Sequence, residues 1–405
     1  MKPTEKTKKN SSKVSSRLSL GERVPKLRFP GFEGEWEAKK FGSLICETNN
    51  RTTKENEDIL LSAAIEGMFL NSELFDHQRG ISNKGYKKIS RNTLILSTQN
   101  LHLGNANVNL RFEHGIVSPA YKTYDIIGCN HYLLSHWIKS EKAKKFFYDA
   151  TTVGASLCRR NVEWETLYEQ TLALPNLDEQ NQLAKFLNLL IARISAQRKL
   201  VELLKKHKRG LLNRIFERSK QTEEWKKYRL DQIAEINPSS ESLPCEFFYI
   251  DLESVSDGVW HDKKVVKKES APSRAQRVIQ KNDILFQMVR PYQQNNLHIT
   301  SSYDKPIVAS TGYAQIRTSQ NPSFIYWLLH SRTFLRKVLL RCTGSSYPAI
   351  NSSDLKEIYV SIPPLEYQDQ YARTLNSISQ KCNIEESLVC HLKNLKSGLL
   401  QQMFV

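Results

Sequence analysis

The sequence predicts a mixed α/β fold in which two tandem α/β domains are each followed by one long helix. Residues 175–216 recur without a gap as residues 363–404, and sixteen of the 42 aligned positions are identical. Each copy closes a longer unit, which opens on Trp36 in the first case and on Trp225 in the second. The two copies are 188 residues apart, whereas the units of a solenoid repeat every 20–50 residues or so. The repeat therefore indicates two complete domains.

The predicted organisation has five parts. Residues 1–20 are rich in Lys and Ser, lack the apolar centre of a secretory signal, and are expected to form a basic, disordered tail. A first domain is expected at 21–174, a helix at 175–220, a second domain at 221–362 and a second helix at 363–405. No run of roughly 18 apolar residues occurs, which predicts that nothing spans a membrane. The seven cysteines are scattered without a C-x-x-C pair, which favours a reducing cytoplasm over a zinc or disulfide framework.

Each domain is expected to contain the same order of elements. Strands are predicted at 93–97 and 283–287, where aliphatic residues lie between turn residues, and at the Ile-Val segments that begin at Ile116 and Ile307. One helix is predicted around 131–150 and one around 324–341, each followed by a glycine turn. The order of elements agrees between the domains although their sequences differ widely.

The repeated helices follow a heptad pattern. Both begin with proline and acidic residues, as helix N-termini prefer. Alternating steps of four and three residues place apolar side chains along one seam of each helix. These are Leu183, Leu187, Leu190, Ile194, Val201, Leu204 and Leu211 in the first helix, and Leu375, Ile378, Val389, Leu392 and Leu399 in the second.

Both seams are interrupted at matched polar positions, Gln197 with Glu385 and Lys208 with Lys396. Polar residues at seam positions set the register of a coiled coil at some cost in stability. The pattern predicts that the helices pair as an antiparallel coiled coil with pseudo-twofold symmetry, which would act as a spacer between the domains. Two amphipathic helices in an ordinary bundle remain the alternative.

The chain carries a net charge of +17, and residues 175–220 account for +7 of it. A strongly basic protein favours an anionic polymer as its partner, with nucleic acid the first candidate, although a generally basic surface is the alternative. The second half of the first helix carries most of its basic side chains, which could follow a phosphate backbone. They are Arg198, Lys199, Lys205, Lys206, Lys208, Arg209, Arg214 and Arg218.

Two loops that follow the strands at 93–97 and 283–287 are rich in amides. Asn and Gln can pair with adenine, and Arg with guanine, in the major groove of DNA. The candidate DNA-binding residues are Gln99, Asn100, His102, Asn105 and Asn107 in the first domain, and Arg290, Tyr292, Gln293, Gln294 and Asn295 in the second. The alternative is an ordinary polar surface loop with self-capping Asn side chains.

No catalytic motif is evident. Adenine methyltransferases hold their base with an (Asp/Asn)-Pro-Pro-(Tyr/Phe) box, and the nearest string, Asn321-Pro-Ser-Phe324, has the wrong third residue and is expected to open a helix. No glycine-rich loop has nucleotide-binding spacing. His131 and His136 lack the Glu of a zincin motif and are expected to pack or cap. The sequence therefore predicts a protein that is not an enzyme and holds no metal.

The chain resembles the specificity subunits of type I restriction–modification systems. The resemblance covers nearly all of the chain after the tail. It rests on the opening segment Val24–Trp36, on the Pro-x-Leu-[Asp/Glu]-x-Gln starts of both helices at Pro175 and Pro363, and on the helix endings around Gly210 and Gly398. The duplicated layout makes the match more specific than any one motif.

The resemblance implies two target-recognition domains, each recognising half of a split, asymmetric site in double-stranded DNA. It also implies that the two helices bind two adenine-N6 methyltransferase subunits, which would hold S-adenosylmethionine, and that endonuclease/translocase subunits join them. The basic tail is not part of the family's pattern.

Two rival interpretations remain. One is a solitary DNA-binding scaffold without a methyltransferase partner. Apolar residues off the seam argue against it because they need a partner: Leu200, Leu203, Leu212 and Phe216. The other is a fused, self-sufficient modification enzyme, which the missing catalytic box argues against.

Overall fold

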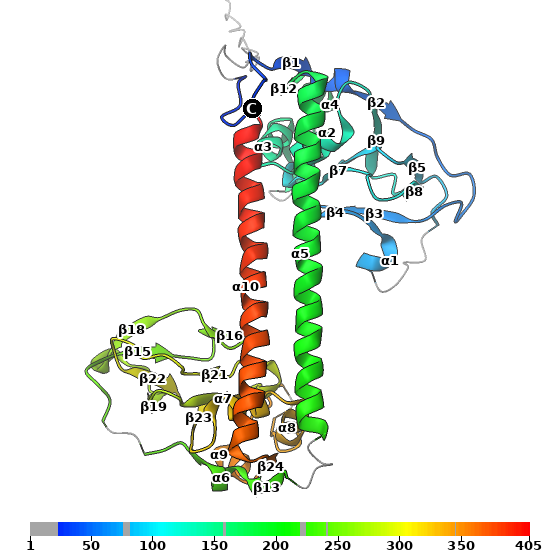
Figure 1. Ribbon diagram of the computed structural model, residues 1–405. Coiled ribbons are helices and arrows are strands. Elements are labelled where there is room, and N and C mark those ends of the chain that lie inside the picture. The colour runs from blue at the N-terminus through cyan, green and yellow to red at the C-terminus, as the bar shows by residue number, and fades with distance from the viewer. Residues whose placement is uncertain (1–22, 76–81, 157–158, 219–223, 240–241, 345) are drawn as a thin grey trace, which may run out of the picture. The chain divides into compact units, whose positions relative to one another are not determined.

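A computed structural model describes residues 23–75, 82–156, 159–218, 224–239, 242–344 and 346–405 of the chain. The tail predicted for residues 1–20 lies outside the described residues. The chain divides into two compact units, Met1–Gln197 with Leu388–Val405, and Arg198–Ser387. Each unit combines an α/β domain with parts of two long helices, α5 (Leu177–Arg218) and α10 (Leu365–Met403) (Figure 1). The predicted mixed α/β fold, with a long helix after each domain, is confirmed.

The domain of the first unit contains two sheet layers and a covering ribbon. The main antiparallel sheet has the strand order β2 (Ile45–Thr48), β9 (Tyr121–Ile126), β6 (Leu94–Ser97) and β7 (Ala106–Val108). The second layer comprises the pairs β3 (Leu61–Ala64) with β4 (Gly67–Leu70) and β5 (Lys87–Ser90) with β8 (His114–Val117). A parallel bridge from Leu60 to Ile116 joins these pairs. The ribbon pairs β1 (Glu37–Lys40) with β12 (Thr171–Leu174).

Helices pack against the two sheet layers of the first unit. They are η1 (Phe41–Leu44), α1 (Asn71–Leu74), η2 (Leu101–Leu103), α2 (His131–Trp137), α3 (Glu141–Asp149) and α4 (Trp164–Glu169), and a hairpin of β10 (Thr151–Ser156) and β11 (Arg159–Val162) follows α3. The core forms where Phe41, Trp137, Phe146 and Phe147 meet edge to face. Aromatic pairs of this geometry add stability beyond the area that they bury.

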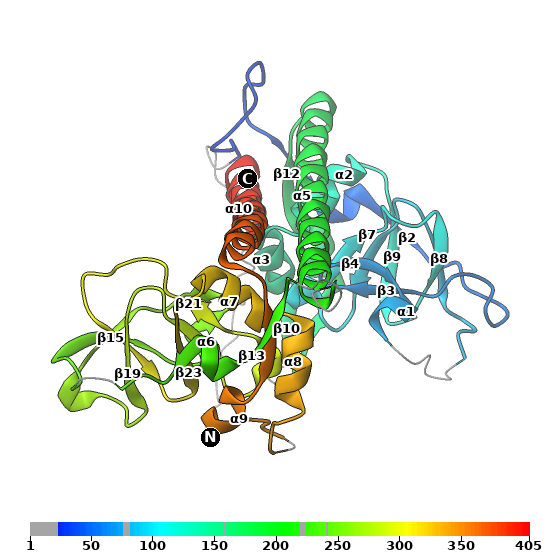
Figure 2. The ribbon, with the colours of Figure 1, turned by 60° about the horizontal axis from the view of Figure 1, so that its bottom comes forward.

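The domain of the second unit has the same layers. Its main antiparallel sheet has the order β14 (Ala234–Ile236), β23 (Tyr313–Thr318), β20 (Ile284–Gln287) and β21 (Leu297–His298). A second sheet has the order β18 (Lys264–Lys267), β15 (Glu246–Ile250), β22 (Ile307–Ser310) and β19 (Ala275–Ile279). The ribbon pairs β13 (Lys226–Arg229) with β24 (Tyr359–Ile362), and a short hairpin pairs β16 (Val255–Ser256) with β17 (Val259–Trp260). The helices are α6 (Leu230–Ile233), η4 (Lys268–Ser270), η5 (Pro291–Gln293), α7 (Pro322–Leu329), α8 (Arg332–Leu339) and α9 (Ser352–Lys356) (Figure 2).

The two domains share one topology. The order β2-β9-β6-β7 in the first main sheet corresponds strand for strand to β14-β23-β20-β21 in the second. The parallel pairing of β15 with β22 corresponds to the parallel bridge between Leu60 and Ile116. Since both frames are alike, differences in function between the domains must come from the side chains on their loops.

The sequence predicted a single helix after each main sheet, and this prediction is wrong in both domains. Two short helices follow instead, α2 and α3 in the first domain and α7 and α8 in the second. The second helix of each pair starts at an N-cap serine, Ser140 or Ser331, whose side chain accepts a hydrogen bond from the backbone N–H three residues on. Such a cap stabilises a new helix start and allows the chain to change direction.

The seam residues of the long helices are buried or half-buried. Leu183, Leu187, Ile194 and Val201 of α5 and Leu375 and Val389 of α10 are buried. The remaining predicted positions, Leu190, Leu204 and Leu211 of α5 and Ile378, Leu392 and Leu399 of α10, are half-buried. The heptad pattern thus describes the face on which each helix packs.

Within each unit, the start of one long helix packs beside the end of the other. In the first unit, Leu183 and Leu187 of α5 share a core with Leu400 and Met403 of α10. In the second unit, Leu212 of α5 shares a core with Ala372 and Leu375 of α10, and Lys205 forms an ion pair with Glu386. The pairing inside each unit is therefore antiparallel.

Two of the four off-seam residues expected to need an outside partner are covered by the chain itself. Leu212 and Phe216 are buried in the core of the second unit, where the Phe216 ring lies 5.4 Å from that of Phe324 and 6.4 Å from that of Trp225. Leu200 and Leu203 remain exposed. The sequence could not separate these pairs because the seam pattern does not show which helix face the domain covers.

One buried glutamine joins each domain to its helix. The side chain of Gln180 accepts a hydrogen bond from the backbone N–H of Asn130 and donates one to the carbonyl of Pro175, both at 2.9 Å. Gln368 makes the same two bonds with Asn321 and Pro363, at 3.1 and 2.9 Å. The identity of these glutamines in the repeat thus has a structural cause.

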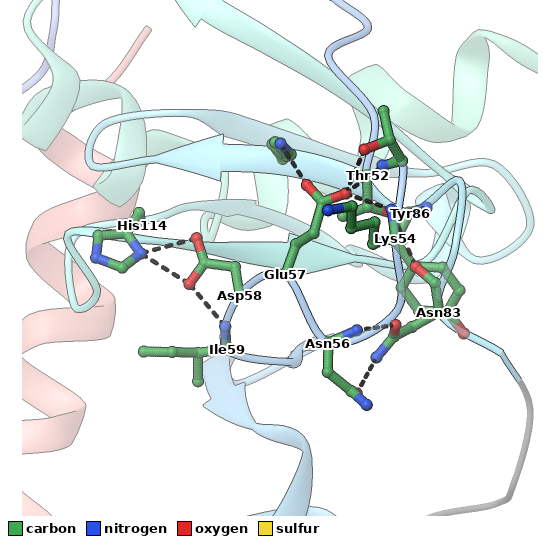
Figure 3. A network of polar contacts seen from close by, with 11 residues as sticks. Thr52, Lys54, Asn56, Glu57, Asp58, Ile59, Asn83, Tyr86 and His114 are labelled. Atoms are coloured by element: carbon green, nitrogen blue, oxygen red, sulfur yellow. Dashed lines mark hydrogen bonds and ion pairs between the residues drawn. The ribbon is translucent and has the colours of Figure 1, made fainter.

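A polar network fixes the loop before β3 (Figure 3). Glu57 accepts hydrogen bonds from the backbone N–H groups of Thr53 and Lys54, and forms an ion pair with Lys88. Led by the Lys88 contact, these bonds lower the pKa of Glu57 to about 2. The side chains of Asn56 and Asn83 pair nearby at 2.8 Å. The network holds the loop because several backbone donors share one carboxylate.

Candidate nucleic-acid interface

The candidate loop of the second domain, residues 290–296, follows β20. The buried side chain of Gln287 holds this loop through hydrogen bonds. Gln287 donates a 2.9 Å hydrogen bond from Nε2 to the side chain of Gln293. Its Oε1 accepts a 3.0 Å bond from the backbone N–H of Asn295, and its own N–H donates to the side chain of Asn296 at 2.8 Å. The loop is therefore preorganised before any ligand binds.

The backbone of this loop is constrained as well. Arg290 and Gln294, which flank η5, both have left-handed backbone conformations, with φ of 52° and 53°. Non-glycine residues adopt this region rarely and at some cost in energy, which the surrounding structure must offset. The bonds from Gln287 supply that support, and Tyr292 between the two strained residues is exposed.

A cleft of about 610 Å³ lies beside this loop within the second unit, and Gln293 and Gln294 line one side of it. The opposite side is formed by the basic half of α5, which contributes Lys205, Lys208 and Arg209. With Arg332 of α8, the cleft has four basic side chains against two acidic ones, Asp257 and Glu386. The structure thus brings part of the predicted amide loop together with part of the predicted basic helix.

Aromatic side chains complete the cleft, and the sequence analysis did not identify them. Tyr326 and Trp327 of α7 and His330, which follows this helix, line the cleft, and Lys208 Nζ lies 5.7 Å from the centre of the Trp327 ring. Burial lowers the pKa of His330 to about 4, so this ring is neutral near pH 7. Trp327 is 5% exposed and Tyr326 and His330 are half-buried, so the groups of the cleft that suit nucleic acid are its cations, which can hold phosphates. In the sequence, these aromatic residues stand out only by the helical spacing of apolar side chains in α7, and this spacing predicts core positions and not a binding site.

The remaining candidates of the second domain lie around the same loop. Gln294 donates a 3.2 Å hydrogen bond to the carbonyl of His330, which ties the loop to α7. Asn295 is half-buried. Arg290 and Tyr292 lie on the part of the loop away from Gln287, and the Arg290 guanidinium lies 4.3 Å from the centre of the Tyr347 ring.

The candidate loop of the first domain has a similar frame and different side chains. The hydroxyl of Ser97, at the end of β6, accepts hydrogen bonds from the backbone N–H groups of Gln99 and Asn100 at 3.4 and 3.1 Å. The side chains of both residues are exposed. His102 is half-buried, and burial, assisted by Arg160, lowers its pKa. Gln99 and Asn100 are thus the candidates here that present free amides to solvent.

Asn105 and Asn107, predicted as DNA-binding residues, have a structural role instead. Both are buried, and their amides donate to the carbonyls of Ala63 and Ala64 at 3.2 and 2.9 Å. The side chain of Asn107 also accepts a 2.7 Å bond from Lys139. These buried amides join β7 and the residue before it to the β3–β4 hairpin, and their burial keeps them from a base edge. Composition alone could not distinguish them from the exposed amides of the same loop.

The string from Asn321 to Phe324 opens helix α7, as predicted. The Asn321 side chain accepts a 2.9 Å hydrogen bond from the backbone N–H of Phe324, which is an N-cap and not a base-binding box. His136 is buried against Asn188, as expected of a packing residue. Within the described residues, no group of three or more His, Cys, Asp or Glu side chains could hold a metal ion, and no helix is long and apolar enough to cross a membrane.

The comparisons with known proteins agree on one family. Residues 222–393 match the family model described as the type I restriction modification DNA specificity domain. The MjaVIII specificity subunit of a type I restriction enzyme from Methanocaldococcus jannaschii is 23% identical over 400 residues, which cover 90% of this chain and 91% of the relative. The HindI specificity subunit from Haemophilus influenzae is 23% identical over 195 residues, which cover 45% of this chain and 41% of the relative.

Solved structures match the fold along nearly the whole chain. The S subunit of a type I restriction–modification system from M. genitalium aligns with a TM-score of 0.59 at 15% identity, covering 94% of this chain and 99% of that one. A chain from a study of assembly and conformational transition of the type I R-M system aligns with a TM-score of 0.54 at 17% identity, covering 90% and 96%. At these identities the likeness shows the fold.

Tandem α/β domains on paired helices, with a matched DNA specificity domain, define a DNA-recognition subunit. Residues 222–393 match the type I restriction modification DNA specificity domain, and along most of its length the chain is similar to specificity subunits of type I restriction–modification systems. Recognition of DNA sequence is the general role of this family, whose members have no catalysis of their own. This similarity supports the expectation that the chain is not an enzyme.

Proposed function

We propose that this chain recognises a bipartite, asymmetric site in double-stranded DNA, with one half-site bound by each domain. The domains responsible are those predicted at residues 21–174 and 221–362. The helices predicted at 175–220 and 363–405 fix the distance between the half-sites, near one duplex turn, since both domains should face the same side of the DNA.

The observation that supports this proposal most strongly is the contrast between a shared frame and different loops. Both main sheets have the same strand order, and the candidate loop follows the corresponding strand, β6 or β20, in each. The loops nevertheless present different side chains, amides from Gln99 and Asn100 in one case and Arg290 with Tyr292 in the other. Two domains with the same sheet topology and different side chains on their candidate loops are well suited to bind two different half-sites.

The basic cleft of the second unit supplies contacts that do not depend on base sequence. Lys208, Arg209 and Arg332 line it, and the described part of the chain gives none of the three an ion pair. Cations placed in this way bind phosphates and position a protein on the duplex, while base contacts provide specificity. The neighbouring loop would then meet base edges.

The helices are proposed to recruit two adenine-N6 methyltransferase subunits. Leu189, Leu203, Ile384 and Leu395 each expose more than half of their surface, which is unfavourable for an isolated helix. In the first unit, two grooves of about 460 and 420 Å³ lie along α5, and both are lined by Asn181, Lys185 and Leu189. Helices of a partner could cover these apolar side chains.

The assembled complex is proposed to act in the cytoplasm. The methyltransferase subunits would hold S-adenosylmethionine and flip one adenine in each half-site for methylation. Endonuclease/translocase subunits would join through the methyltransferases. This chain would contribute recognition, spacing and recruitment, and no catalytic step.

A single-molecule methylome tests the proposal. Cells that express this chain with its neighbouring methyltransferase are compared with cells that lack this chain. We expect a split, non-palindromic motif with one methyladenine on each strand, present only with the chain. No new methylation, with both proteins soluble, would contradict recruitment and favour the solitary DNA-binding scaffold, which a DNA pull-down would then reveal.

A further inference from the structure

A second element lies against the candidate loop of the second domain, and it contributes an exposed aromatic residue. Thr343 and Ala349 pair at the base of a short hairpin through backbone hydrogen bonds in both directions, at 2.9 and 3.0 Å, and the described residues of this hairpin include Tyr347 and Pro348. The hairpin is tied to the loop because the N–H of Arg290 donates a 2.8 Å bond to the carbonyl of Pro348. A bridge from Val289 to Ala349 adjoins this bond.

The hairpin places Tyr347 against Arg290. The Arg290 guanidinium lies 4.3 Å from the centre of the Tyr347 ring, within the range of a cation–π contact. Tyr347 is nevertheless 65% exposed, so the contact is not a means of burying an aromatic residue. In the described part of the chain, no carboxylate forms an ion pair with Arg290, and its N–H donors therefore remain free for a ligand.

The neighbouring amides take part in hydrogen bonds within the domain. Gln293 accepts the hydrogen bond from Gln287, and Gln294 donates to the carbonyl of His330. Arg290, in contrast, sits on a strained left-handed backbone that directs its side chain onto the ring. Strain of this kind persists where the surrounding structure fixes it, and it is frequent at functional positions.

The first domain has an Arg–Tyr contact in the corresponding place, with a different arrangement. Arg160, on the β10–β11 hairpin, lies 4.1 Å from the centre of the Tyr148 ring. Its guanidinium also donates to the hydroxyl and the carbonyl of Thr151, at 2.7 and 2.8 Å. This arginine is therefore occupied within its own domain, whereas among the described residues the Arg290 guanidinium makes no hydrogen bond and lies against the Tyr347 ring.

We propose that Arg290 and Tyr347 form a base-reading pair of the second domain, which recognises a guanine in its half-site. Arg290 would donate two hydrogen bonds to O6 and N7 of the guanine in the major groove. Tyr347 would restrict the guanidinium to the plane that this contact requires. The inference rests on the proposed function of DNA recognition, and it adds a specificity-determining residue that neither the amide composition nor the heptad pattern indicates.

The test is methylation of a plasmid library by the chain with its neighbouring methyltransferase, where the library is randomised across the wild-type motif. Arg290→Lys keeps the charge and loses the planar fork, and Tyr347→Ala removes the ring while Tyr347→Phe keeps it. We expect R290K and Y347A each to relax the preference for guanine at one base pair of one half-site, by about 10- to 100-fold. Y347F should retain the wild-type preference.

A matched control lies in the same domain. Lys227 Nζ lies 4.7 Å from the centre of the Tyr359 ring, an exposed contact of the same kind on the β13–β24 ribbon. Tyr359→Ala should leave the preference at every base pair unchanged. If R290K and Y347A keep the wild-type preference, or lose methylation equally at all sequences, the base-reading role is wrong. If the wild-type chain itself gives no motif, the proposed function fails instead.

Discussion

The side-chain oxygen of Asn188 on α5 lies 2.9 Å from Nε2 of His136 on α2. The corresponding contact in the second unit joins Asn376 of α10 to Trp327 of α7, whose indole N–H donates at 2.8 Å. A tryptophan can only donate there, so the shared geometry indicates that His136 also donates, with its proton on Nε2. Both the neutral and the charged ring can donate from Nε2, and it is burial that favours the neutral form of His136.

The burial of His136 in its neutral form predicts that the free energy of unfolding depends on pH. Burial, with a smaller contribution from Lys396 and against the hydrogen bond to Asn188, lowers the pKa of His136 from 6.5 to about 4. Between pH 6.5 and about 4, the unfolded chain therefore binds a proton at His136 more readily than the folded chain does. The free energy of unfolding accordingly decreases as the pH falls from about 6.5 towards 4. At pH 5 we expect the His136 site to cost about 2 kcal/mol relative to pH 7.5.

Calorimetric unfolding at the two pH values measures this effect. His136→Gln keeps a donor for Asn188 and should reduce the difference between pH 7.5 and pH 5. His207→Gln changes an exposed histidine on α5 and should leave the difference as in the wild type. Equal pH dependence in H136Q and the wild type would contradict the assignment.

The second prediction concerns the buried glutamine of the second unit. Gln368 satisfies the N–H of Asn321 and the carbonyl of Pro363, and it also donates a 2.8 Å bond to the side chain of Gln320. Gln368→Ala leaves these groups without partners in a buried position, which should lower the free energy of unfolding by about 2–4 kcal/mol. Urea unfolding followed by tryptophan fluorescence measures the change.

Gln370 provides the matched control for this change. It is also identical in the repeat, to Gln182, but its side chain is exposed. Gln370→Ala should therefore change stability by less than about 0.5 kcal/mol. A loss in Q370A as large as that in Q368A would show that the buried bonds are not the cause.

The sequence predicted the parts of the fold that repeat in a regular pattern. The strands ending at Ser97 and Gln287 are aliphatic runs between turn residues, both long helices have a heptad period, and the structure has these elements where expected. The break between the two short helices of each domain was missed because an N-cap serine at Ser140 or Ser331 resembles any surface serine. Whether such a serine caps a new helix depends on where the following residues pack.

The site was predictable only in part, for a related reason. Loop composition indicated amides, but Asn105 and Asn107 turn inward to a strand edge while Gln99 stays exposed. Tyr347 contacts Arg290 across 57 residues of chain, and no local pattern relates the two. Burial and long-range contacts determine which polar side chains remain available to bind a ligand, and the local composition of the sequence predicts neither of them.

The third prediction tests the basic cleft. Replacing Lys208 and Arg209 with Gln removes two cations that line it. Because binding of phosphates releases counterions, DNA affinity should fall similarly for all sequences, and the slope of log affinity against log salt should decrease by about 1 for each phosphate that is no longer bound. Binding of the complex with its methyltransferase is measured on a duplex with the methylome motif and on an unrelated duplex, at salt concentrations between about 50 and 200 mM.

The control for this prediction removes the same charge elsewhere in the domain. Lys267 and Lys268 are exposed and lie outside the cleft. Their double replacement by Gln should leave the salt dependence close to that of the wild type. A change of base preference at a single position in the Lys208/Arg209 variant would instead indicate a direct contact with a base, and would contradict a phosphate role.

The final prediction concerns spacing. Four residues inserted between Gln197 and Arg198 lengthen α5 by about 6 Å and rotate its second half by about 40° beyond one turn. If the helices set the distance between half-sites, the methylome motif should keep both half-sites and change the gap between them, or methylation should be lost with assembly. Exchange of residues 221–362 for the second domain of another specificity subunit is the complementary control, since it should change one half-site and preserve the gap. An insertion that alters the bases of a half-site would contradict the spacer role, because the proposed function assigns base recognition to loops such as that of Arg290 and not to the helix.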